Sequence, residues 1–184
     1  MARPSDPARR SATLARATDY VLAHGLAGLS LRPLAAALGT STRMLLYDFG
    51  DKERLISEIL AEARRRLRDL YAGTIDAASL TRGDTVRAIW AWLTDPAQAP
   101  YLRLFFQVHV DAMARPAAYA ESGRPLITDW LDFLGSGLRT DRLDPETATL
   151  VIGTVRGLLL DRLTTGDPER TDRALNRFAD LIDG

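Results

Sequence analysis

Apolar residues recur along most of the chain at intervals of three and four, the period of a helix that buries one face. The clearest cases are 7–24, with Leu14, Ala17 and Val21, and the segment after Pro168. No stretch alternates apolar and polar residues in the manner of a half-buried strand. The pattern therefore predicts an all-α fold of about nine helices.

Proline, glycine and capping residues separate the predicted helices. Their expected spans are 7–24, 31–38, 42–47, 51–71, 84–94, 100–114, 126–138, 145–166 and 168–182. Asp144-Pro145-Glu146 and Asp167-Pro168-Glu169 each place a capping carboxylate before a proline at the first helical position. Residues 1–7, which are polar and hold two prolines, are predicted to be disordered.

The second and third predicted helices follow each other closely enough to form a helix-turn-helix. Ser30 is a natural N-cap for the second helix, and Gly39 ends it because glycine accepts the left-handed conformation of a helix C-terminus. Either Ser41 or Thr42 offers the hydroxyl that caps the third helix. Such a unit lays its second helix in the major groove of DNA.

Residues 13–60 resemble the head of the tetracycline-repressor (TetR) family of bacterial transcription regulators. The matching features are the apolar pair Leu34-Ala35, the turn glycine Gly39, the capping hydroxyl of Ser41 or Thr42, the run Leu46-Tyr47-Asp48-Phe49 and the pair Lys52-Glu53. The family pattern is Leu-Tyr-x-x-Phe, and the interval from Gly39 to Tyr47 is one residue longer than is usual. The capping position is Thr42 when counted back from Tyr47, and Ser41 when counted forward from Gly39. Asp48 stands where the family often has histidine.

Charge and length agree with a DNA-binding head followed by a larger domain. The chain has 184 residues with 24 basic and 24 acidic side chains, but residues 1–72 carry a net charge of +4 and the remainder −4. We expect a helix-turn-helix domain over 1–54 and a helical ligand-binding and dimerisation domain over 55–184. The absence of cysteine excludes disulfides and thiolate metal sites. No apolar leader or membrane segment is evident, which favours the cytoplasm.

The candidate DNA-binding residues gather around the predicted third helix. They are Thr40, Ser41, Thr42, Arg43, Met44, Tyr47 and Lys52. Arg43 is the candidate guanine reader because its forked guanidinium matches two acceptors on that base, although it could instead grip a phosphate. Tyr47 and Lys52 would bind phosphates. Arg3, Arg9 and Arg10 form either an arm that reaches DNA or a solvated tail.

A second group of candidates would bind a small molecule. The resemblance implies an inducer pocket, and the aromatic residues of the second half are its candidate lining: Trp90, Phe105, Phe106, His109, Met113, Trp130 and Phe133. Such a lining offers little charge, so the expected effector is largely apolar with at least one hydrogen-bonding group. The alternative is an ordinary core in which His109 is hydrogen-bonded internally.

The last two predicted helices are candidates for a homodimer interface. The helix over 145–166 is apolar on more sides than one neighbour covers, and Gly153 and Gly157 lie four apart on one face. The expected contacts are Val151, Ile152, Gly153, Val155, Gly157, Leu159 and Phe178. Alternatively, the two glycines admit another helix of the same subunit.

Together these features predict a homodimeric, ligand-responsive repressor that binds a palindromic operator in double-stranded DNA. No phosphate loop, metal-spaced cluster or nucleophile motif is present in the sequence, so no catalytic residue, metal or cofactor is expected. The rival interpretation is an all-helical enzyme or a protein that sequesters small molecules, whose head makes protein contacts.

Overall fold

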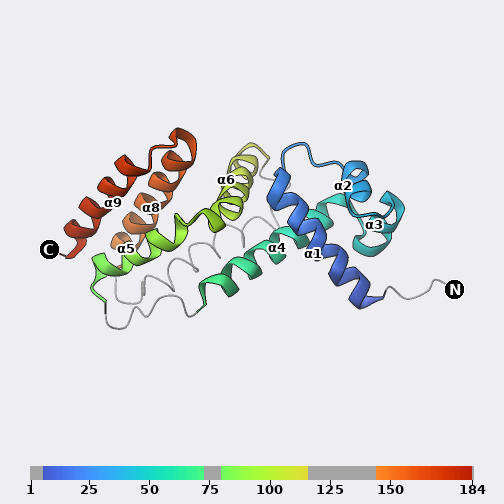
Figure 1. Ribbon diagram of the computed structural model, residues 1–184, viewed down its shortest axis with the longest axis horizontal. Coiled ribbons are helices and arrows are strands. Elements are labelled where there is room, and N and C mark those ends of the chain that lie inside the picture. The colour runs from blue at the N-terminus through green and yellow to red at the C-terminus, as the bar shows by residue number, and fades with distance from the viewer. Residues whose placement is uncertain (1–5, 73–79, 116–143, 184) are drawn as a thin grey trace. The chain divides into compact units, whose positions relative to one another are not determined.

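The computed structural model describes residues 6–72, 80–115 and 144–183 (Figure 1). Over these ranges the chain is all-α, as predicted, and contains no strand. The helices are α1 (Pro7–His24), α2 (Leu31–Ala37), α3 (Thr42–Phe49), α4 (Lys52–Tyr71), α5 (Arg82–Leu93), α6 (Ala99–Ala114), α8 (Pro145–Thr165) and α9 (Pro168–Asp183), with a short 3-10 helix, η1 (Pro96–Gln98). Every described helix begins and ends within two residues of its predicted bounds. The helix expected over 126–138 lies outside the described residues.

These helices belong to two compact units, each built from separate stretches of the chain. The first contains α1, α2, α3, most of α4 and α6; the second contains the last turn of α4 together with α5, η1, α8 and α9. None of the described helices is both long enough and apolar enough to cross a bilayer. The division into domains at residue 54 stays a prediction.

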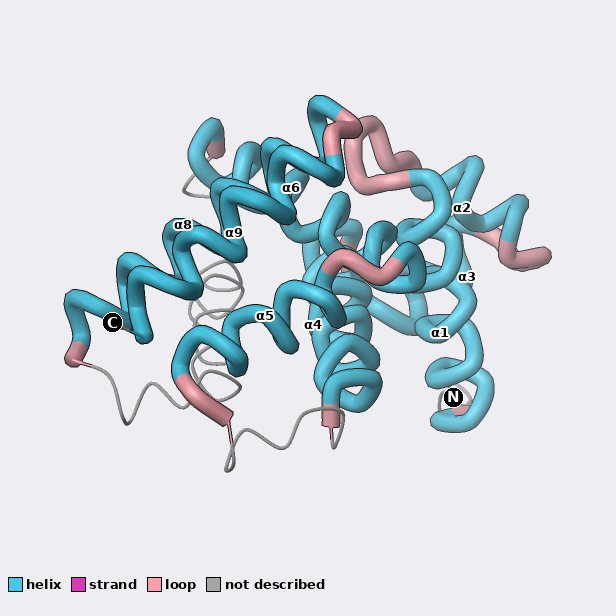
Figure 2. Tube along the Cα trace, turned by 60° about the vertical axis from the view of Figure 1, so that its left-hand side comes forward, coloured by secondary structure: helices cyan, strands magenta, loops and turns pink. Residues whose placement is uncertain are grey.

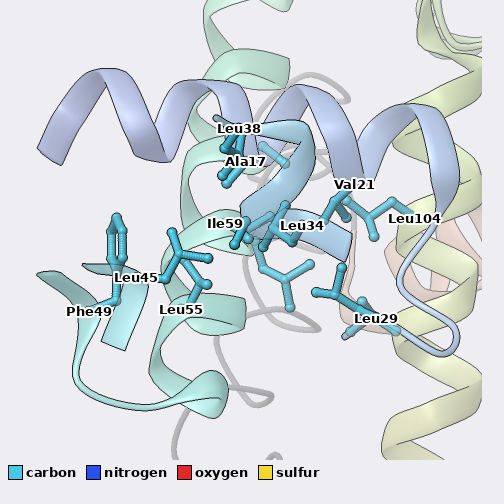
Figure 3. Close-up of a cluster of buried hydrophobic side chains, with 14 residues drawn as sticks. Ala17, Val21, Leu29, Leu34, Leu38, Leu45, Phe49, Leu55, Ile59 and Leu104 are labelled. Atoms are coloured by element: carbon cyan, nitrogen blue, oxygen red, sulfur yellow. The ribbon is translucent and has the colours of Figure 1, made fainter. Parts of the chain in front are cut away.

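The first unit is organised around one buried apolar cluster (Figure 3). Val21 of α1, Leu34 of α2, Leu45 of α3, Ile59 of α4 and Leu104 of α6 are all at most 4% exposed. Burying a side chain of this size contributes about 1.5–3 kcal/mol, so five elements hold one another in place. The helix-turn-helix is therefore fixed from behind by α1, α4 and α6.

The inner stripe of α4 ends one turn earlier than the sequence pattern indicates. The apolar spacing of this helix predicts an inner stripe of Leu55, Ile59, Ala63, Leu67 and Leu70. The first four are buried, but Leu70 is 49% exposed. The prediction for Leu70 is wrong because the first unit ends at Leu67, and a periodic apolar position faces a core only where another element covers it.

Helix α6 is joined to the head by a polar contact as well as by Leu104. The side-chain oxygen of Gln107 accepts a hydrogen bond of 2.9 Å from the backbone N–H of Leu26, in the loop between α1 and α2. Gly25, at φ +80°, lies against the same amide: a Cβ there would come within 2.9 Å of its nitrogen. The loop at Gly25 and Leu26 therefore packs closely against Gln107 of α6.

In the second unit α9 packs against both α5 and α8 (Figures 1 and 2). The carboxylate of Asp183 caps the start of α5, accepting from the Gly83 N–H at 2.8 Å and from the Thr81 hydroxyl at 2.9 Å. These hydrogen bonds lower the pKa of Asp183. A Cβ on Gly83 would lie 2.6 Å from the carbonyl oxygen of Ala179, so glycine is what lets the two helices approach this closely.

A polar cluster ties α5, α8 and α9 together about two helical turns further along α5. The indole N–H of Trp90 donates to Asp172 at 2.7 Å, and the guanidinium of Arg162 donates to the same carboxylate oxygen at 2.7 Å. Trp90 is 5% exposed. The buried indole thus has its hydrogen bond satisfied inside this helix triplet, as a buried tryptophan requires.

Candidate nucleic-acid interface

The turn between α2 and α3 is a Schellman motif centred on a left-handed glycine. Gly39 has φ +63°; its N–H donates to the Ala36 carbonyl at 3.1 Å, and the Thr40 N–H donates to the Ala35 carbonyl at 2.9 Å. A Cβ on Gly39 would meet no neighbouring atom within 4 Å. Glycine is therefore favoured here by the left-handed backbone conformation and not by lack of space. The predicted helix stop at Gly39 is confirmed.

The structure decides which hydroxyl caps α3. Ser41 stands at the N-cap in an extended conformation, and its side-chain oxygen accepts a hydrogen bond of 3.2 Å from the Met44 N–H. Thr42 is the first residue of the helix proper. Ser30, predicted to cap α2, occupies the N-cap position but makes no side-chain capping bond.

Helix α3 has one buried and one exposed face. Leu45 and Phe49, four residues apart, are 1% and 2% exposed and pack into the core (Figure 3). Arg43, Leu46 and Tyr47 lie on the opposite face and are exposed. A helix held by its inner face presents the outer one to solvent in a fixed orientation, which is the arrangement that major-groove readout requires.

This burial pattern also corrects the register of the resemblance. The pattern Leu-Tyr-x-x-Phe, counted back from the buried Phe49, places its leucine at Leu45 and its tyrosine at Leu46. The turn after Gly39 is then of ordinary length, in agreement with the cap at Ser41. Assigning the pattern to Leu46 and Tyr47 was wrong by one residue. The four-residue interval from Leu45 to Phe49 was the signal in the sequence that could have revealed it.

On the outer face of α3 the side chain of Arg43 is exposed, and that of Tyr47 is 49% exposed. Lys52 is half-buried in the first turn of α4. Backbone amides at a helix N-terminus can bind a phosphate, but one of those in this turn already has a partner: the Arg54 N–H donates to the carboxylate of Asp51 at 2.7 Å. Thr40, Thr42 and Met44 are exposed or half-buried around the same end of α3.

Arg9 and Arg10 are neither an arm nor a solvated tail. Both guanidinium nitrogens of Arg9 donate to the carboxylate of Asp48, at 2.7 and 2.8 Å, and this pairing raises the pKa of Arg9. Arg10 donates to the Asp48 carbonyl at 2.9 Å and to both oxygens of Glu58, while its guanidinium lies 4.6 Å from the ring centre of Phe49. The sequence patterns missed this role because the hydrogen-bond partners lie 38 to 48 residues away along the chain. Arg3 lies outside the described residues.

The predicted ligand-binding residues fall into separate groups. Phe105, Phe106 and His109 are half-buried on α6, where the rings of Phe105 and His109 lie 4.0 Å apart and Nδ1 of His109 lies 3.1 Å from the Phe105 carbonyl oxygen. Met113 is 76% exposed. Trp90 belongs to the second unit, and Trp130 and Phe133 lie outside the described residues. A common cavity stays a prediction.

The predicted dimer residues divide between the two sides of α8. Val151, Ile152, Val155 and Leu159 are at most 7% exposed and form the inner face of the helix. Gly153 and Gly157 are exposed, and no described atom comes within 4 Å of a Cβ built on either. They therefore do not admit another described helix of the same chain. Phe178 on α9 is half-buried.

Several solved structures resemble this chain over most of its length. The multidrug binding protein EbrR complexed with proflavin is 26% identical, with 92% of this chain and 98% of that chain covered and a TM-score of 0.69. A TetR-family member from Streptomyces coelicolor A3 is also 26% identical, over 93% and 98% of the two chains, with a TM-score of 0.68. A Rhodococcus transcriptional regulator, 22% identical over 94% and 95%, shares the fold with a TM-score of 0.73. No protein-family model and no curated protein matches the sequence.

The geometry of α2, its turn and α3 is that of a DNA-binding helix-turn-helix. The fold that carries it is shared over 94% of the chain with a transcriptional regulator. The likeness to a TetR-family structure extends over 93% of the chain and is not confined to the head. The resemblance to the TetR family drawn from residues 13–60 is confirmed.

Proposed function

We propose that the protein is a homodimeric repressor, which binds a palindromic operator and leaves it when a small, largely apolar molecule binds. The observation that carries the DNA-binding part is the outward face of α3, where Arg43 and Tyr47 stand exposed opposite the buried Leu45 and Phe49. Arg43 then reads guanine, while Tyr47 and Lys52 hold phosphates.

A seam along α8, which no described residue covers at Gly153 or Gly157, supports the homodimer. Leu150 and Leu160 are 66% and 45% exposed, and with Gly153 and Gly157 they follow intervals of three, four and three residues along one face. That spacing is the repeat of a helix that packs against another helix, and glycine permits close approach. A two-fold partner on this seam matches the symmetry of a palindromic operator.

The effector response is supported by the position of α6 and by a relative. The half-buried Phe105, Phe106 and His109 share α6 with Leu104 and Gln107, which contact the head. A ligand that binds against α6 would therefore act on a helix that contacts the loop after α1. EbrR is a multidrug binding protein that has been seen with proflavin and ethidium. An effector that favours the non-binding state by about 3 kcal/mol would weaken operator binding on the order of a hundredfold.

The decisive experiment begins with selection of an operator from a random-sequence duplex library, followed by fluorescence anisotropy. We expect a two-fold symmetric consensus. Arg43→Ala should cost about 1–3 kcal/mol and relax preference at one base position in each half-site. Lys52→Ala should weaken binding to all sequences and lower the salt slope by about one. Arg103→Ala, which removes the same charge from an exposed position on α6, is the matched control. Equal binding to selected and random DNA would refute the proposal.

Proflavin and ethidium, tested on the protein without DNA, are the first probes of the effector site. A ligand that binds only the folded state raises the melting temperature, by an amount that grows with its concentration. The same ligands should release the protein from an operator immobilised on a surface. Unchanged melting across a panel of aromatic cations and neutral aromatic compounds would argue against an apolar effector.

A further inference from the structure

Resting on the DNA-binding function proposed above, we infer that Leu46 is a second specificity-determining residue, which contacts the C5-methyl group of a thymine in each half-site. Leu45 and Leu46 are chemically identical neighbours, yet Leu45 is 1% exposed and Leu46 is 39% exposed. The core therefore uses only the first of the pair.

Leu46 lies within the proposed reading surface of α3. It follows Arg43 by three residues and precedes Tyr47 by one, so the three side chains occupy one face of the helix. The opposite face is held by Leu45 and Phe49, which prevents α3 from turning Leu46 inward. When Arg43 faces a base edge, Leu46 faces the groove beside it.

The chemistry of the side chain limits what it can recognise there. Leucine has no donor or acceptor, so it cannot bind a phosphate or the polar edge of a base. The apolar group exposed in the major groove is the C5-methyl of thymine. Three residues of helix rise about 4.5 Å, slightly more than one base-pair step, so the thymine should lie within about two base pairs of the guanine that Arg43 reads.

The test replaces each thymine of the selected operator, one at a time, with deoxyuridine, which lacks only the methyl group. For the wild-type protein we expect one thymine in each half-site at which this change weakens binding about fourfold, the effect of losing one buried methyl-sized contact. Leu46→Ala should bind the thymine operator about as weakly as the wild type binds the uracil operator, and should lose nothing more on uracil. Leu80→Ala, the same truncation at an exposed position before α5, should keep the full uracil effect.

The outcomes separate this inference from the proposed function. Selective operator binding without any uracil-sensitive thymine, or a uracil effect that persists in Leu46→Ala, would overturn the role of Leu46 and leave the regulator intact. An absence of sequence-selective binding would overturn both. Because Leu46 lies outside the buried cluster, its truncation should leave the melting temperature near that of the wild type, which circular dichroism checks.

Discussion

Arg9 and Asp48 form a bidentate ion pair that joins the first turn of α1 to the last turn of α3. The two nitrogen–oxygen distances are 2.7 and 2.8 Å, and the Asp48 side chain is 1% exposed while that of Arg9 is 39% exposed. A forked pair of this kind fixes direction as well as distance. The acid that replaces the family's frequent histidine is thus a positioning group for the recognition helix and does not face phosphate.

Loss of this pair should lower specificity more than it lowers total DNA affinity. Asp48→Asn keeps the shape of the side chain but removes the charge, so α3 is held less firmly while the head becomes more basic. We expect a melting temperature lower by a few degrees and a smaller ratio of operator affinity to random-DNA affinity. Glu53→Gln, at an exposed position, changes the charge equally and should leave that ratio unchanged. An unaltered ratio in Asp48→Asn would show that Arg9 is dispensable for positioning.

The cap of α3 gives a direct comparison of two neighbouring hydroxyls. Ser41→Ala removes the acceptor of the Met44 N–H and should lower the free energy of unfolding by about 1 kcal/mol. Thr42→Ala should be close to neutral, because Thr42 is the first helical residue and not the cap. Urea denaturation measures both, and the reverse order would move the cap back to Thr42.

Close approach of α5 and α9 should make Gly83 intolerant of any side chain. In Gly83→Ala the new methyl group would meet the backbone carbonyl of Ala179, which cannot rotate away as a side chain does. We expect a loss of about 1–3 kcal/mol in the free energy of unfolding, typical of overpacking. Asp183→Ala in the same background should not restore it, because the carbonyl remains. Wild-type stability for Gly83→Ala would show that the helices separate easily.

The exposed seam of α8 predicts how oligomeric state and function are linked. Gly153→Leu fills the space that the proposed partner helix would occupy, and should weaken dimerisation and operator binding together while helical content is kept. Ala23→Leu adds the same side chain to an exposed position on α1 and should change neither. Sedimentation velocity decides: an undisturbed dimer would remove Gly153 from the interface, and a monomeric wild-type protein would refute the two-fold model.

A carboxylate on α4 should make part of the stability depend on pH. Hydrogen bonds from Arg65 and then Arg66 lower the pKa of Glu62 from its usual 4.5 to about 2. The folded form therefore stays charged to lower pH than the unfolded chain, so the contribution is complete above about pH 4.5 and is lost as the pH falls toward about 2.

Glu62→Gln tests this contribution by urea denaturation at pH 6 and pH 3. At pH 6 the variant should be less stable than the wild type by about 1 kcal/mol, since Arg65 is partly solvated, and the difference should shrink at pH 3. Glu53→Gln, exposed on the same helix, should show no such change. A difference that is the same at both pH values would mean that the charge of Glu62 is not what stabilises the fold.

The sequence by itself determined the helices and the class of protein. Helix ends are set by local chemistry, and so Asp144 before Pro145, and Gly39 with its positive φ, could be recognised from neighbouring residues alone. The same holds for the apolar period that buries Val21, Ile59 and Leu175. The family resemblance also rests on residues that are close in sequence.

Only the tertiary structure decided which of several similar residues are buried or ion-paired and which face solvent. Leu45 and Leu46 lie four and three residues before Phe49, and both intervals are helical. The family pattern favours Leu45, but the burial of Leu45 and the exposure of Leu46 were decided by the core against which α3 packs. Arg9 looked like a free basic residue until folding placed it beside Asp48. Such choices depend on contacts between residues far apart in the chain, and a local pattern carries no information about what lies opposite it in the folded molecule.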